Sequence, residues 1–245
     1  MSLEASYERV FRLDSSSFQL RLDVIDVLAD IRPSARIIVE KGAEARKCVE
    51  TLLFEHLEIC VGSSCLISPG ILQFADHHCI SDQGKQCNFV RLYVSKERGR
   101  AEATKAADEL AQDSALGAEL GYPGCCIHAV RKRGAVPKIL ESLRLYSAGG
   151  RYDPYAWPVA HLYDAGLIPH FPCSMSCQDT HRIAQARLRL MISVDSIYQT
   201  QFWRRFASLN TMVYPAEVDA YPWNRQKELG SYTPLAPLYR LEVAV

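Results

Sequence analysis

Two pairs of cysteines carry the chemistry that this sequence suggests most clearly. Cys125 and Cys126 are adjacent in the stretch GYPGCC, and Cys173 and Cys177 are four residues apart in FPCSMSC. Residues four apart on a helix have Cβ atoms about 5–6 Å apart, and this separation is too wide for an easy disulfide. It suits two thiolates on one metal ion, so we expect Cys173 and Cys177 at the start of a helix, on one face.

The adjacent pair can bind the same centre only where the backbone is irregular, because neighbouring side chains diverge in regular helices and strands. Gly121 and Gly124 allow a positive φ angle, and Pro123 fixes the turn between them. The sequence therefore predicts that Cys125 and Cys126 lie on an irregular turn and meet the second pair.

A centre built from these two pairs has four thiolates, as iron–sulfur clusters and structural zinc sites do. We expect an iron–sulfur cluster, with zinc as the alternative and a thiol–disulfide protein as a third reading. The chain has nine cysteines and no export signal, which favours metal or redox chemistry over a disulfide framework. Cys79, Cys87 and His181 are left open as further ligands, whereas Cys48 and Cys60 are expected in the core, on a helical face.

A loop rich in proline and aromatic residues over 149–173 ends on the second pair, and we expect it to line the substrate-binding site. Histidine near a metal commonly serves as a ligand or a general acid and base, so His170 and His161 are the expected catalytic residues. Aromatic and cationic side chains nearby could bind a small-molecule substrate: Arg131, Arg151, Tyr155 and Trp157. The leading hypothesis is an enzyme with redox or sulfur-handling chemistry, and the alternative is a non-enzymatic module held by structural zinc.

The stretches ALGAELGYPGCCIHAV and PHFPCSMSCQDTHRIA resemble an uncharacterised prokaryotic family, the domain of unknown function 483. Its motifs are Leu-Gly-Tyr-Pro-x-Cys-Cys and Pro-Cys-Ser-x-x-Cys, and the match covers about residues 88–190. The resemblance implies that the residues of both motifs belong to one site, and it brings no established activity.

A weaker resemblance links the cysteine order to subunits of the heterodisulfide-reductase type, which bind unusual iron–sulfur clusters. Cys87, the adjacent pair and the last pair repeat that order. Ile127 stands where those proteins have glycine, and the last pair is spaced CxxxC. This analogy favours iron–sulfur over zinc.

The elements that must position these residues form an α+β or α/β fold. A mixed part over 1–98 is expected to carry a small sheet, and a mainly helical part over 99–245 the cysteine motifs, in two domains or a single one. Periodicity and terminator residues predict three helices and two strands before the first motif: helices over 18–31, 43–60 and 99–120, and strands over 36–40 and 88–96. Two short helices are expected over 127–133 and 136–148, and one or two long helices from about 174.

Composition limits the partners. Lysine plus arginine and aspartate plus glutamate number 28 each, which disfavours nucleic acid as a partner. No apolar run has the length of a signal peptide or a membrane span, so a soluble, cytoplasmic protein is expected. An electron-transferring cluster would also require a redox partner protein.

Overall fold

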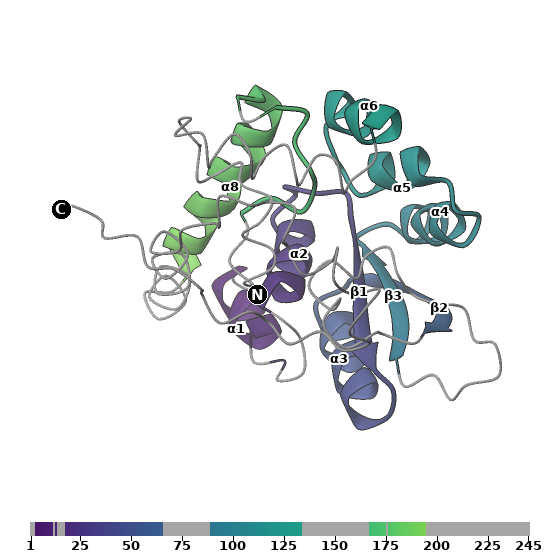
Figure 1. Ribbon diagram of the computed structural model, residues 1–245. Helices are drawn as coiled ribbons and strands as arrows, with labels where there is room; N and C mark the ends of the chain where they lie inside the picture. Colours follow the sequence, from purple (N-terminus) through teal and green to yellow (C-terminus); the bar gives the residue numbers. More distant parts are fainter. Residues whose placement is uncertain are drawn as a thin grey trace, which may run out of the picture.

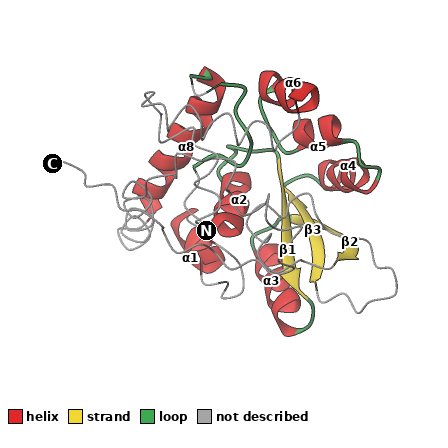
Figure 2. Cartoon of the chain, viewed as in Figure 1, coloured by secondary structure: helices red, strands yellow, loops and turns green. Residues whose placement is uncertain are grey.

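The computed structural model describes residues 3–11, 13, 18–65, 89–133, 167–174 and 176–194. These ranges contain seven helices and one small sheet, which confirms the α+β class (Figures 1 and 2). In chain order the elements are α1 (Leu3–Phe11), α2 (Phe18–Leu28), β1 (Ser34–Glu40), α3 (Ala43–Phe54), β2 (Glu58–Cys65), β3 (Phe89–Ser95), α4 (Arg98–Glu109), α5 (Asp113–Glu119), α6 (Gly124–Arg133) and α8 (Gln178–Val194).

The sheet has three antiparallel strands in the order β1-β3-β2. Ile37 on β1 lies opposite Leu92 on β3, and Ala35 lies opposite Val94. Because side chains alternate along a strand, these apolar residues all point to one face of the sheet. That face is buried against the helices of the N-terminal half.

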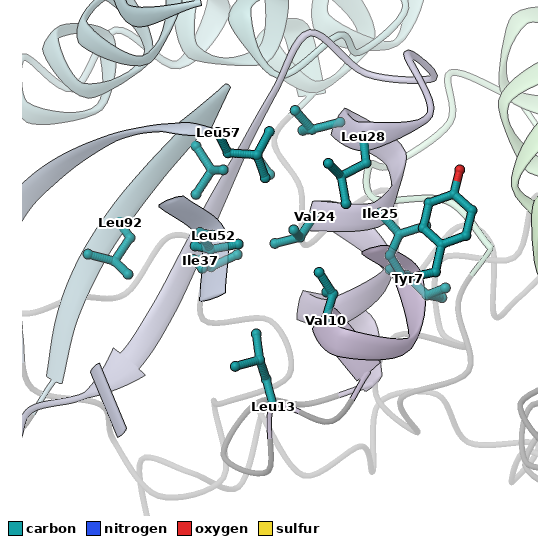
Figure 3. Packing of buried hydrophobic residues seen from close by; sticks show 14 of the residues in the cluster. Tyr7, Val10, Leu13, Val24, Ile25, Leu28, Ile37, Leu52, Leu57 and Leu92 are labelled. Carbon is teal, nitrogen blue, oxygen red and sulfur yellow. The ribbon is translucent and has the colours of Figure 1, made fainter. Parts of the chain in front are cut away.

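The main hydrophobic core fills the space between this face and α1, α2 and α3 (Figure 3). Leu22 and Ile25 of α2 are almost completely buried in it, at the helical spacing that the sequence predicted. Leu167, Ile168 and Ala184 come from the segment that carries the second cysteine motif, and they belong to the same core. The core thus holds that segment against the N-terminal half of the chain.

The opposite face of the sheet is polar and is covered by α4. The Asp108 carboxylate on α4 accepts hydrogen bonds from Arg36 on β1, at 2.6 Å, and from Arg91 on β3, at 3.1 Å. The Tyr93 hydroxyl donates to the same carboxylate at 2.6 Å. One carboxylate therefore joins α4 to two strands. This contact fixes the position of α4 on the sheet, from which the chain continues into α5 and α6.

The helix predicted over 43–60 is too long. Helix α3 ends at Phe54, His56 adopts a positive φ of 58°, and strand β2 begins at Glu58. Cys60 consequently lies on a half-buried strand position, whereas Cys48 is buried in the core as expected. The error arose because β2 is stabilised by pairing with β3, a distant segment that a local pattern does not reveal.

The single helix predicted over 99–120 is two helices, α4 and α5. Ala111 has a positive φ of 52° between them, and the Gln112 amide donates to the Ala107 carbonyl at 2.8 Å. The bend lets Leu116 and Leu120 pack back against Ala107 in a small second cluster. This packing, rather than helix propensity, decides where the chain turns toward the GYPGCC motif.

The predicted boundary near residue 98 stays a prediction, as does the cytoplasmic location. None of the helices in the part of the chain described here is long and apolar enough to cross a membrane.

Candidate metal centre

The four motif cysteines converge. The sulfur atoms of Cys125, Cys126, Cys173 and Cys177 all lie within 4.8 Å of one another. The Cys125 sulfur is 3.8 Å from that of Cys126 and 3.7 Å from that of Cys177, and the Cys126 and Cys177 sulfurs are 3.7 Å apart. The prediction that the two pairs meet is confirmed, and the four cysteines form a cluster that could hold a metal ion.

The adjacent pair lies in the first turn of α6. The amides of Cys126 and Ile127 both donate to the Pro123 carbonyl, at 2.9 and 3.0 Å, which starts the helix. The predicted irregular backbone at the pair is therefore wrong. In a helix every Cα–Cβ bond tilts toward the N-terminus, so two short side chains in the first turn can reach one point beyond the helix end.

Gly121 makes the turn that aims α6 at the cluster. Its φ is +75°, as the sequence predicted, whereas Gly124 is not among the residues with positive φ. A Cβ atom at Gly121 would lie 2.6 Å from Cδ of Pro33, closer than real Cβ contacts. Only glycine satisfies both the dihedral angle and the packing here.

We expect Gly121→Ala to lower the free energy of unfolding by about 2–5 kcal/mol, the sum of the left-handed backbone penalty and the overpacking against Pro33. Urea unfolding followed by circular dichroism would measure it. Gly99→Ala is the matched control, because a Cβ there meets nothing within 4 Å and its φ is ordinary; it should raise stability by about 0.5–1 kcal/mol. Equal effects of the two variants would contradict this account of Gly121.

The second pair lies just before α8, not within it as predicted. The Cys177 amide donates to the Ser174 carbonyl at 3.2 Å, which closes a turn, and the Cys177 carbonyl accepts from the His181 amide at 3.0 Å. Cys177 therefore immediately precedes α8, and its carbonyl accepts the first hydrogen bond of the helix. The Cys173 amide donates to the Cys126 sulfur at 3.3 Å, so backbone as well as side chains join the two motifs.

Two helix N-termini thus face the sulfurs, α6 with Cys125 and Cys126, and α8 with Cys177. The unpaired amides and the positive end of the helix dipole at each N-terminus favour thiolate over thiol. A centre of four thiolates and one divalent cation carries a net charge of about −2, which this arrangement helps to offset.

The pKa values of the thiols are unequal. Burial raises the pKa of Cys126, and it raises that of Cys125 to about 11, with hydrogen bonding to Cys177 adding to the latter shift. Burial acts the same way on Cys177, but hydrogen bonds from the Thr180 hydroxyl and amide and from two neighbouring thiols lower its pKa to about 7. Burial thus opposes thiolates at Cys125 and Cys126, and a bound cation would compensate their charge.

His170 lies behind the cluster. It is buried, and its Nε2 atom is 2.9 Å from the Thr180 hydroxyl, which in turn is 3.4 Å from the Cys126 sulfur. Its ring also contacts that of Tyr122 in the GYPGCC turn, with centroids 5.3 Å apart. His170 thus touches the cluster through Thr180, a residue that the sequence analysis missed, and its catalytic role stays a prediction.

None of the remaining predicted site residues is placed at the cluster within the residues that the structure describes. Arg131 is exposed on α6, five residues after Cys126. His161, Arg151, Tyr155 and Trp157 lie outside the described residues, as do Cys79 and Cys87. Their proposed roles stay predictions.

A buried ionic network, also missed from the sequence, holds the two motifs against α2. Arg187 on α8 is fully buried and pairs with Asp23 and Asp26 of α2, its Nε donating to Asp26 at 2.7 Å. Arg32 pairs with Asp23 at 2.8 Å and donates from Nε to the Leu120 carbonyl at 2.9 Å. Asp23 therefore links α8 to the turn before α6.

The sequence offers one signal for this network, since Asp23 and Asp26 are three apart among the apolar residues of 22–28 and so share a face. Nothing local identifies Arg187 as their partner, more than 160 residues away.

Compared with models of protein families, with curated proteins and with solved structures, the chain matches none. The fold and the site by themselves define an α+β protein in which a four-cysteine cluster joins two helix N-termini.

Proposed function

We propose that the four cysteines bind a single zinc ion in tetrahedral geometry, and that this ion holds α8 and its preceding turn against α6. The observation that carries the proposal is the set of sulfur separations, 3.7, 3.7 and 3.8 Å. Tetrahedral zinc with bonds of about 2.3 Å requires sulfurs about 3.8 Å apart.

An iron–sulfur cluster demands wider spacing, because its cysteines bind different iron atoms across the body of the cluster. The distance between ligand sulfurs is about 4 Å when they share one metal ion, and it extends to about 7 Å when they bind an iron–sulfur cluster. All four sulfurs here lie within 4.8 Å. The separations therefore favour one metal ion over the cluster that the residue types alone suggested.

Four protein thiolates fill a tetrahedral zinc, which is the arrangement of structural sites. The ion would cross-link segments that are about 50 residues apart, as the separation of Cys125 and Cys177 shows. The zinc supplies binding free energy, and the chain supplies the turns and helix ends that bring its ligands together.

A redox-active iron centre is the second candidate, and one observation favours it. The Cys173 amide donates to the Cys126 sulfur, and the Thr180 hydroxyl lies 3.4 Å from that sulfur. Hydrogen bonds to sulfur help to set the reduction potential of iron–thiolate centres. In this case the protein would be an electron-transferring or sulfur-handling enzyme with a small-molecule substrate and a redox partner protein. The resemblance to the domain of unknown function 483 is compatible with both candidates.

Protein purified without oxygen should be colourless and contain one zinc per chain, with four sulfur ligands at about 2.3 Å by X-ray absorption. Cys48→Ala, a core substitution outside the cluster, should keep the same metal content. Brown protein that absorbs near about 400 nm and holds iron with acid-labile sulfide would replace the zinc proposal with the second candidate. A folded protein without any metal would overturn both.

A further inference from the structure

The four cysteines of the cluster differ in access to solvent. Cys126 is 1% exposed and Cys177 is 7% exposed. Cys173 is half-buried, whereas Cys125, in the first turn of α6, is exposed. A molecule arriving from solvent therefore meets the Cys125 sulfur first.

The same sulfurs also differ in the hydrogen bonds that they accept. The Cys126 sulfur accepts from the Cys173 amide at 3.3 Å and lies 3.4 Å from the Thr180 hydroxyl. The Thr180 amide also hydrogen-bonds the Cys177 sulfur. Such donors withdraw electron density from a thiolate and stabilise it against attack on an electrophile.

The Cys125 sulfur has a different polar neighbour. It lies 3.9 Å from Oδ2 of Asp179, a carboxylate in the first turn of α8. A carboxylate accepts hydrogen bonds and cannot donate one when ionised, so it leaves the electron pairs of a metal-bound thiolate undiminished. Asp179 is itself held by an ion pair with Arg182 on the same helix.

From these contrasts we infer that Cys125 is a nucleophile whose thiolate, kept deprotonated by the bound metal, accepts an alkyl group from a small alkyl donor. The inference rests on the proposed metal site. A sulfur electron pair forms the new S–C bond, and the bond between carbon and the leaving group breaks with its electrons staying on the leaving group. No oxidant or reductant is required, and Cys125 becomes a neutral thioether that is a weaker metal ligand.

The chemistry sets the substrate class. The donor must be small enough to approach one exposed sulfur of a cluster whose other sulfurs are shielded, and its carbon must be a soft electrophile, because the thiolate is a soft nucleophile. The attacking thiolate needs no general base, since the metal already holds it deprotonated.

The test uses iodoacetamide as the alkyl donor on the metal-loaded protein, at less than one equivalent. The protein is then denatured and digested, and the label at each cysteine is counted by mass spectrometry. Because a hydrogen bond to a charged group slows attack by about tenfold or more, Cys125 should be labelled at least about tenfold faster than Cys126 and Cys177. It should also be labelled faster than Cys173, which is half-buried.

The variant Asp179→Asn distinguishes the effect of the neighbouring carboxylate on the reactivity of Cys125 from the effect of solvent exposure. The amide can donate to the sulfur where the carboxylate cannot, so labelling of Cys125 should slow by about tenfold. Asp113→Asn is the matched control, an aspartate in the first turn of α5 that has no contact with the cluster among the described contacts, and it should change the rate by less than about twofold.

Metal content is measured on the same samples. A protein without metal overturns the proposed function and this inference together. A fully metal-loaded protein in which Cys126, Cys173 or Cys177 is labelled as fast as Cys125, or in which Asp179→Asn leaves the rate unchanged, overturns the inference alone.

Discussion

Cys177→Ser is expected to abolish metal binding and to lower the melting temperature by about 8–16 °C. Cys177 is buried, and its sulfur lies 3.7 Å from those of Cys125 and Cys126. Serine does not ionise at neutral pH and is a poor zinc ligand, so the variant loses one of the four metal ligands. A metal present at about 1,000 times its dissociation constant contributes about 4 kcal/mol, and a chain of this size loses about 2–4 °C per kcal/mol. Elemental analysis and calorimetry measure the two effects.

Cys60→Ser is the control for that variant. Cys60 is half-buried on β2 and does not belong to the four-cysteine cluster, so its substitution should leave metal content unchanged. A chelator should lower the melting temperature of the wild-type protein and have no further effect on Cys177→Ser. Full metal occupancy in Cys177→Ser would show that the four-thiolate site is wrong.

Arg187→Leu is expected to destabilise the protein by about 3–5 kcal/mol, because it leaves buried carboxylates without their compensating charge. Burial opposes a charge on Arg187, but Asp26 and Asp23 outweigh that effect and keep its pKa above the ordinary value, so the guanidinium is charged in the folded protein. Its side chain is fully buried, as is that of Asp26. Equilibrium unfolding in urea measures the loss.

Arg189→Leu is the matched control, two residues along α8 on an exposed position, and it should change stability by less than about 0.5 kcal/mol. The double variant Asp26→Asn with Arg187→Leu should recover part of the loss, since it removes one of the uncompensated charges. If Arg187→Leu behaved like Arg189→Leu, the network would not hold α8 in place.

The pattern of side chains predicted several elements correctly. Short runs of β-branched and aromatic residues predicted β1 and β3, and helical spacing predicted α2 and α8. These elements follow local rules, because the residue types and their spacing within each segment favour the observed conformation. Strand β2 follows from pairing with the distant strand β3, and the break between α4 and α5 follows from packing of Leu116 and Leu120 back on Ala107; the sequence pattern missed both.

For the site, the sequence by itself determined the ligand atoms: four thiols in two motifs, each beside a turn, of types that bind soft metals. Only the tertiary structure decided how far apart the sulfurs lie, which is the property that separates one metal ion from a cluster. It also decided that Cys125 is exposed while Cys126 is buried, although the two are neighbours in the chain. The reason is physical, since distance and burial depend on how α8 and the turn before α6 are held against α2. Asp23 links them through Arg187 and Arg32, and it lies outside both motifs.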